Sequence, residues 1–151
     1  MRPWIFLTSI TPDWQGVGWN IRTAACLRAF SRTVPVHLVC LSLPHDPPPP
    51  KNTTQFCSDV TRLSLLPEYP DDMPAPWPLK SHEQSSSYPD HLRYDLRPLA
   101  DELTALAGRL KAHTIVVRGI VSVGALHFFL PFNPRIWLEL DECSGKSLHS
   151  R

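Results

Sequence analysis

The chain has 151 residues, of which 42% are hydrophobic and 19% are charged, and its formal net charge is +1. This size and composition predict one globular domain over residues 1–151 and exclude a largely disordered protein. The near-neutral charge argues against nucleic acid as a partner, because binding to phosphates along a nucleic acid needs a surplus of lysine and arginine.

The amino-terminal half of the sequence predicts three strands and one helix. The apolar run Trp4–Ser9 is typical of a strand that is buried on both faces. Apolar residues at helical spacing predict a helix over Trp19–Arg32, and the aliphatic run Val34–Leu43 predicts a second buried strand. The prolines of Pro44–Asn52 exclude helix and central strand, so we expect an extended surface connection there. Val60–Leu66 predicts a third strand.

The carboxyl-terminal half predicts a further alternation of strands and helices after a long loop. The Pro- and Ser-rich loop at about 67–95 is either a mobile flap or a tolerated insertion. Leucines at helical spacing predict a helix over Leu96–Lys111. His113–Gly119 predicts a fourth strand, Ile120–Leu130 a short buried helix that prolines stop, and Arg135–Leu140 a fifth strand.

This order of elements defines the predicted fold class. Strands that alternate with helices favour an α/β, Rossmann-like domain, with a mostly parallel sheet of about five strands flanked by helices. In such sheets ligands bind at the carboxyl ends of the strands, near the point where the strand order reverses. We therefore expect site residues in three segments, namely 9–18, 118–119 and 141–144.

Two further features bear on where the protein works. The four cysteines form no C-x-x-C pair, which argues against a zinc site and favours a reducing, cytoplasmic compartment. The longest apolar stretch, 114–132, contains Arg118 and His127, so we expect no transmembrane segment. The sequence predicts no bound cofactor and no metal.

The segment "TPDWQGVGWNIR" carries the main site hypothesis. Gly16 and Gly18 suggest a dinucleotide fingerprint, but Ile21 stands where its third glycine belongs, and the loop after the strand is too long. Two readings remain open. A glycine loop at a helix start can offer backbone N–H groups to a phosphate, with Arg22 as a bidentate partner. Alternatively, the glycines permit a turn and Arg22 is only solvated.

Four residues at or just after the carboxyl ends of the fourth and fifth strands complete the list of candidate site residues. Arg118 and Gly119 end one strand, where the arginine could bind an anionic group. Asp141 and Glu142 follow the other strand and, together with Glu139, could be metal ligands or an acid/base pair in the cleft. Alternatively, Asp141 or Ser144 could cap the next helix. None of the sequence patterns identifies a catalytic residue.

Several of these features together resemble one known family. A first strand ending in "LTS", Pro12, the Gly16–Gly18 loop, Arg22 in the first helix and the strand "VPVHLVCLSL" resemble the amino-terminal half of GT-B glycosyltransferases, in particular the retaining group-4-like family. The segments "HTIVVRGIVSVGAL" and "RIWLELDECSGKS" resemble the fourth and fifth strands of that half. The similarity extends along almost the whole chain but includes no single diagnostic motif.

The resemblance implies an enzyme that transfers a sugar from a nucleotide-sugar donor to a sugar or lipid acceptor. It implies that this domain is the acceptor side, that Gly16 and Gly18 approach the donor phosphates, and that the carboxyl-terminal nucleotide-sugar domain is absent. The chain would then be inactive alone and would take both substrates only when a second domain completes it. The alternatives are a non-catalytic Rossmann-like binding module and, less favoured, a nucleotide-using oxidoreductase.

Overall fold

The computed structural model describes residues 2–42, 46–65 and 96–139. Five parallel strands form one sheet in the order β3-β2-β1-β4-β5, which confirms the predicted α/β, Rossmann-like class. The strands are β1 (Trp4–Thr8), β2 (Val36–Ser42), β3 (Asp59–Ser64), β4 (Thr114–Arg118) and β5 (Arg135–Glu139).

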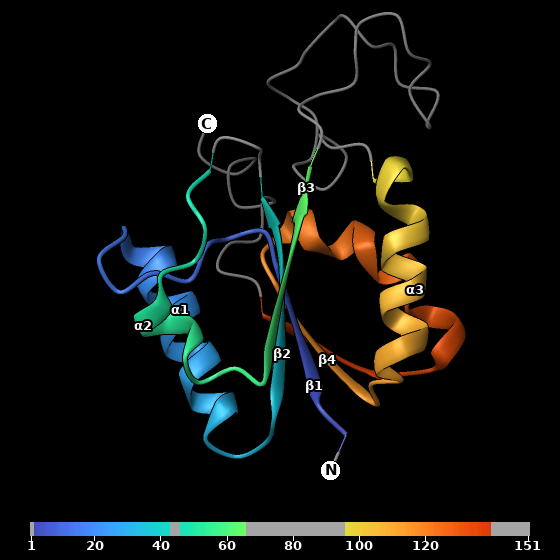
Figure 1. Ribbon diagram of the computed structural model, residues 1–151, viewed down its shortest axis with the longest axis horizontal. Helices are drawn as coiled ribbons and strands as arrows, with labels where there is room; N and C mark the ends of the chain where they lie inside the picture. The colour runs from blue at the N-terminus through green and yellow to red at the C-terminus, as the bar shows by residue number, and fades with distance from the viewer. Residues whose placement is uncertain (1, 43–45, 66–95, 140–151) are drawn as a thin grey trace, which may run out of the picture.

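Helices cover both faces of this sheet. Figure 1 shows α1 (Gly18–Ser31) and α2 (Lys51–Thr54) on one side and α3 (Ala100–Leu110) on the other. Three short 3₁₀ helices complete the described part, η2 (Arg97–Leu99), η3 (Ile120–Phe128) and η4 (Leu130–Phe132). The parallel strands and the helices between them follow from the alternating order of elements along the chain.

The core has two apolar layers because successive residues of a strand point to opposite faces of the sheet. The layer under α3 joins strand residues to one face of that helix: Ile5, Leu7, Val39, Leu41, Ile115, Val117, Leu103, Leu106 and Ala107. The layer under α1 is smaller: Phe6, Leu27, Val36, Leu38, Cys40 and Val116. All seven residues of β2 are buried, as its largely aliphatic sequence predicts, and they include the polar His37 and Ser42.

Some predicted elements differ in detail from the structure. Ile120–Leu130 is not an α-helix but the 3₁₀ helix η3, which ends at Phe128. The following turn, η4, includes Pro131, because proline is tolerated at the start of a helix and stops it only further in. The sequence predicts an extended connection over Pro44–Asn52, but α2 begins at Lys51, once the prolines end. The predicted loop at about 67–95 lies outside the described residues.

Strand β5 is unlike the other strands in its exposure. Ile136, Trp137 and Leu138 are 39%, 55% and 49% exposed, whereas every residue of β4 beside it is buried. Trp137 keeps one ring contact to the α1 layer, a T-shaped pair with Phe30 at 5.7 Å between centroids. The sheet therefore ends, among the described strands, in one that is apolar yet poorly covered.

Candidate functional site

The strand order places the candidate site between β1 and β4. From β1 the sheet grows one way through β2 and β3, and the other way through β4 and β5. The connections that leave β1 and β4 at their carboxyl ends therefore turn to opposite faces and leave a crevice between them. Thr8 and Arg118 are register partners at this point.

Gly119 lets the two connections approach each other closely. Its φ is +83°, a conformation that side chains disfavour. A Cβ built there would stand 3.1 Å from Ser9 Oγ and 3.2 Å from Ile10 Cδ1. The structure thus brings the predicted Gly119 against the start of the β1–α1 loop, where it has a packing role.

The β1–α1 loop is tied at both ends by hydrogen bonds. Thr8 Oγ1 donates to the carbonyl of Ile10 and accepts from its N–H, each at 2.9 Å. Near the helix, Asn20 Nδ2 donates to the carbonyl of Thr11 at 2.8 Å, and the N–H of Asp13 donates to the carbonyl of Asn20 at 3.3 Å. These bonds fold the loop back over the first turn of α1.

The two predicted glycines of this loop differ in their surroundings. A Cβ on Gly16 would stand only 2.5 Å from Cβ of Asn20, so this position needs glycine for packing. At Gly18, the first residue of α1, a Cβ would have nothing within 4 Å. Gly18 therefore begins a helix beside open space, and it is the glycine that a ligand can approach.

The amino terminus of α1 has features that favour an anion. Its N-cap residue, Val17, makes no side-chain cap, and its first turn carries no acidic residue. The first N–H groups of a helix have no acceptors within the helix and concentrate positive partial charge. Arg22 lies about one turn further on and is exposed. Val17 and Trp19, 60% and 51% exposed, flank the same turn.

Arg118 lies inside the fold, 1% exposed, beneath α1. Its Nη1 lies 3.2 Å from Oε1 of Glu139, and its Nε donates to Oγ1 of Thr23 at 3.1 Å. Cys26 on α1 donates its thiol hydrogen to the same Glu139 oxygen, with 3.6 Å between sulfur and oxygen. This cluster fastens α1 to the ends of β4 and β5. Arg118 and the exposed Arg22 do not share one surface.

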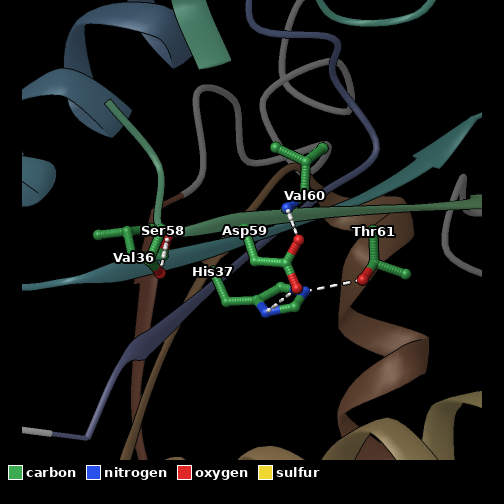
Figure 2. Close-up of polar contacts among 6 residues, drawn as sticks. All are labelled: Val36, His37, Ser58, Asp59, Val60 and Thr61. Atoms are coloured by element: carbon green, nitrogen blue, oxygen red, sulfur yellow. Dashed lines mark hydrogen bonds and ion pairs between the residues drawn. The ribbon is translucent and has the colours of Figure 1, made fainter. Parts of the chain in front are cut away.

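A second polar cluster, which the sequence did not reveal, joins β2 to β3 (Figure 2). His37 is 2% exposed, and its Nε2 lies 2.7 Å from Oγ1 of Thr61. Its Nδ1 lies 3.6 Å from Oδ2 of Asp59. Burial lowers the pKa of His37 from its ordinary 6.5 and outweighs the opposing effect of Asp59, while Arg109 lowers this pKa further. The ring is therefore neutral near pH 7.

A groove of about 290 Å³ lies beside this cluster, between β3 and α3. Thr61 belongs to both the cluster and the groove. The other lining residues are Leu63, Glu102, Ala105, Leu106 and Arg109. The signal that could have found the cluster is the register His37↔Asp59, which only a known strand pairing provides.

The remaining sequence candidates, Asp141 and Glu142, lie outside the described residues. Within the described ranges, no three His, Cys, Asp or Glu residues gather to hold a metal ion. None of the described helices combines the length and the apolar character needed to cross a membrane. Comparison with family models, curated proteins and solved structures finds no match for this chain.

Proposed function

We propose that this domain is the acceptor side of a glycosyltransferase, which moves a sugar from a nucleotide-sugar donor to an acceptor. The observation that carries the proposal is the start of α1, which lies at the reversal of strand order. There, Gly18 leaves open space, the N-cap residue Val17 makes no side-chain cap, and Arg22 is exposed one turn further on. The resemblance of this loop and its flanking strands to the GT-B family supports the same interpretation.

The physical argument concerns the donor phosphates. Backbone N–H groups at a helix start can bind phosphate oxygens directly, and a glycine at that position lets the phosphate come close. An arginine one turn away adds charge and two parallel N–H donors. Arg118 is buried and forms an ion pair with Glu139. Arg118 therefore helps to pack α1 and is not part of the exposed surface.

The proposal includes a second domain that supplies the nucleotide pocket. The described part of the site is a single helix terminus beside one exposed arginine, with apolar Val17 and Trp19 around it. Such a surface can hold phosphate weakly, but it provides no pocket for a base. We therefore expect weak binding of the donor by this chain and turnover only when a nucleotide-binding half is added.

Titration calorimetry with UDP and UDP-glucose tests the phosphate contact. Gly18→Asp places a carboxylate where the phosphate would lie, yet an acid suits a helix start, so the fold is kept. We expect Gly18→Asp to abolish binding. Thr104→Asp, at an exposed position of α3, adds the same charge and should leave binding unchanged. Similarly, Arg22→Ala should weaken binding about tenfold, which corresponds to about 1.4 kcal/mol. Arg32→Ala, a second exposed arginine of the α1 region, should not weaken it.

Sugar transfer is measured with and without a separately supplied carboxyl-terminal half of the GT-B type. Turnover only in the mixture supports the proposal, whereas turnover by the isolated chain contradicts the need for a second domain. The alternative is a non-catalytic binding module. It is favoured by Glu139, because this acidic residue at the strand ends forms an ion pair with Arg118 and has a structural role. That alternative predicts anion binding without turnover under either condition.

A further inference from the structure

The two outer strands of the described sheet differ in how they are protected. An outer strand exposes backbone N–H and C=O groups and can pair with another chain, and charged residues commonly prevent this. On β3, the charged Arg62 stands between the apolar residues Val60 and Leu63, and Asp59 begins the strand. On β5, three consecutive apolar residues are between 39% and 55% exposed, and charges stand only at the two ends, Arg135 and Glu139.

The hydrogen bonds to β4 fix which backbone groups of β5 face outward. The N–H of Arg135 donates to the carbonyl of His113 at 2.7 Å, and the carbonyl of Glu139 accepts from the N–H of Gly119 at 3.4 Å. In a parallel ladder, alternate residues direct both groups to the same neighbour. Arg135, Trp137 and Glu139 therefore direct their N–H and C=O groups to β4. Ile136 and Leu138 direct theirs to the opposite side, where no described strand lies.

The sequence of β5, "RIWLE", is self-complementary when two copies run antiparallel about Trp137. Arg135 then lies opposite Glu139 of the second copy, so each end of the pair joins opposite charges. Ile136 lies opposite Leu138, and these are the residues whose backbone groups face outward. The two Trp137 residues meet at the twofold axis as a non-hydrogen-bonded pair, where opposing side chains are closest.

We propose that this protein forms a dimer through antiparallel pairing of β5 with β5 of a second copy. Ile136 of each copy lies opposite Leu138 of the other, and each such pair forms two N–H···O=C hydrogen bonds. The twofold axis generates two of these pairs. The apolar side chains of both faces gain a cover, and the two sheets become one of ten strands, which lies within the usual range.

The charges select a second copy in this orientation. A parallel pairing of two β5 strands would place Arg135 opposite Arg135 and Glu139 opposite Glu139, and like charges directly opposite are unfavourable. An antiparallel pair shifted by one residue would pair outward-facing groups with inward-facing ones. Pro134 limits extension beyond the amino end of the strand. A pairing of five residues is shorter than a standard interface, so the dimer should dissociate on dilution.

Sedimentation velocity over a wide range of protein concentration is the first test. The unmodified chain should pass from monomer to dimer as concentration rises. Ile136→Lys should raise the dissociation constant at least tenfold, because it sets a charge against Leu138 of the partner. Val60→Lys is the matched control, since Val60 on the other outer strand is 38% exposed and Ile136 is 39% exposed. Arg135→Glu should also weaken the dimer, by placing two acids opposite each other.

Hydrogen exchange on the unmodified chain keeps the test decisive if a variant fails to fold. The amides of Ile136 and Leu138 should exchange more slowly at high concentration than at low concentration, while the amide of Trp137, already bonded within the sheet, should not change. Trp137→Cys tests the register, because cysteines at this central pair are close enough for an intermolecular disulfide that peptide mass spectrometry can identify. Arg135→Cys should give none.

A monomer at every accessible concentration would overturn the proposal. So would a dimer that Ile136→Lys and Val60→Lys weaken equally, or one in which the amides of Ile136 and Leu138 exchange independently of concentration. Each of these outcomes leaves the anion site at the start of α1 untouched, because Gly18 and Arg22 lie on a different element.

Discussion

The ion pair between Arg118 and Glu139 offers a test of how the candidate site is built. Glu139→Gln keeps the shape of the side chain and removes its charge, so the Arg118 guanidinium, 1% exposed, loses its ion pair with Glu139. Breaking a fully buried pair costs about 3–5 kcal/mol, whereas exposed pairs contribute about 0.2–1 kcal/mol. Glu139 is 38% exposed, which places the expected loss between these limits, at about 2 kcal/mol.

A double-mutant cycle isolates this loss from other effects of the substitution. In Arg118→Met, which keeps apolar volume beneath α1, Glu139→Gln should cost close to nothing, because no buried cation then needs the carboxylate. The coupling is measured from urea unfolding midpoints, followed by circular dichroism at low protein concentration. Glu102→Gln, on the exposed face of α3, is the control and should change stability by less than about 0.5 kcal/mol.

The cycle has a result that would refute the reasoning. If Glu139→Gln costs the same with Arg118 as with Met at that position, the ion pair contributes nothing specific to the stability of the domain. For a domain of this length, a loss of about 2 kcal/mol should lower the melting temperature by about 4–8 °C. A shift of less than one degree would refute the reasoning as well.

Three further predictions follow from the local geometry. Gly16→Ala should cost about 1–3 kcal/mol, because its Cβ collides with the first turn of α1, whereas Gly18→Ala should be neutral or stabilise by up to about 1 kcal/mol; both are read from urea midpoints. The pKa of His37 is lowered from 6.5 in the folded protein, so just below pH 6.5 the unfolded chain binds more protons than the folded one. The free energy of unfolding should therefore be at its full value above pH 6.5 and should fall as the pH drops toward the folded pKa. His37→Gln should flatten this fall in urea midpoints measured from pH 5 to 8. Burial raises the pKa of Cys40 to about 12 and that of Cys57 to about 11, so both thiols should resist iodoacetamide at pH 8 until the protein unfolds, as peptide mass spectrometry would show.

The parts of the fold that sequence could predict are those where one local pattern decides the outcome. The largely aliphatic sequence of β2 favours a buried strand, and the spacing of leucines in α3 favours a helix that covers a sheet with one face. The 3₁₀ geometry of η3 could not be foreseen, because it depends on how Ser122 bonds back to the carbonyl of Arg118 and how Phe129 enters the core.

The sequence predicts where the described candidate residues lie in the sheet, but not which contacts their side chains make. A parallel sheet puts the β1–α1 loop and the end of β4 together, so the close approach of Gly119 to the start of that loop follows from connectivity. Whether Arg118 faces the crevice or the core depends on which partner lies beneath α1. That partner, Glu139, is 21 residues away on another strand. The pairing of His37 with Asp59 and Thr61 depends in the same way on strand register.

Glu139 links the two parts of the molecule for which we propose functions. Within one chain it holds Arg118 and so fixes α1, whose amino terminus forms the proposed phosphate site. In the proposed dimer the same carboxylate also lies opposite Arg135 of the second copy. Glu139→Gln should therefore lower both the stability of the domain and the affinity of the dimer. Measurements at different protein concentrations separate the two effects. Unfolding in dilute solution reports only on the pair with Arg118, whereas Arg135→Glu alters the dimer and leaves that intramolecular pair in place.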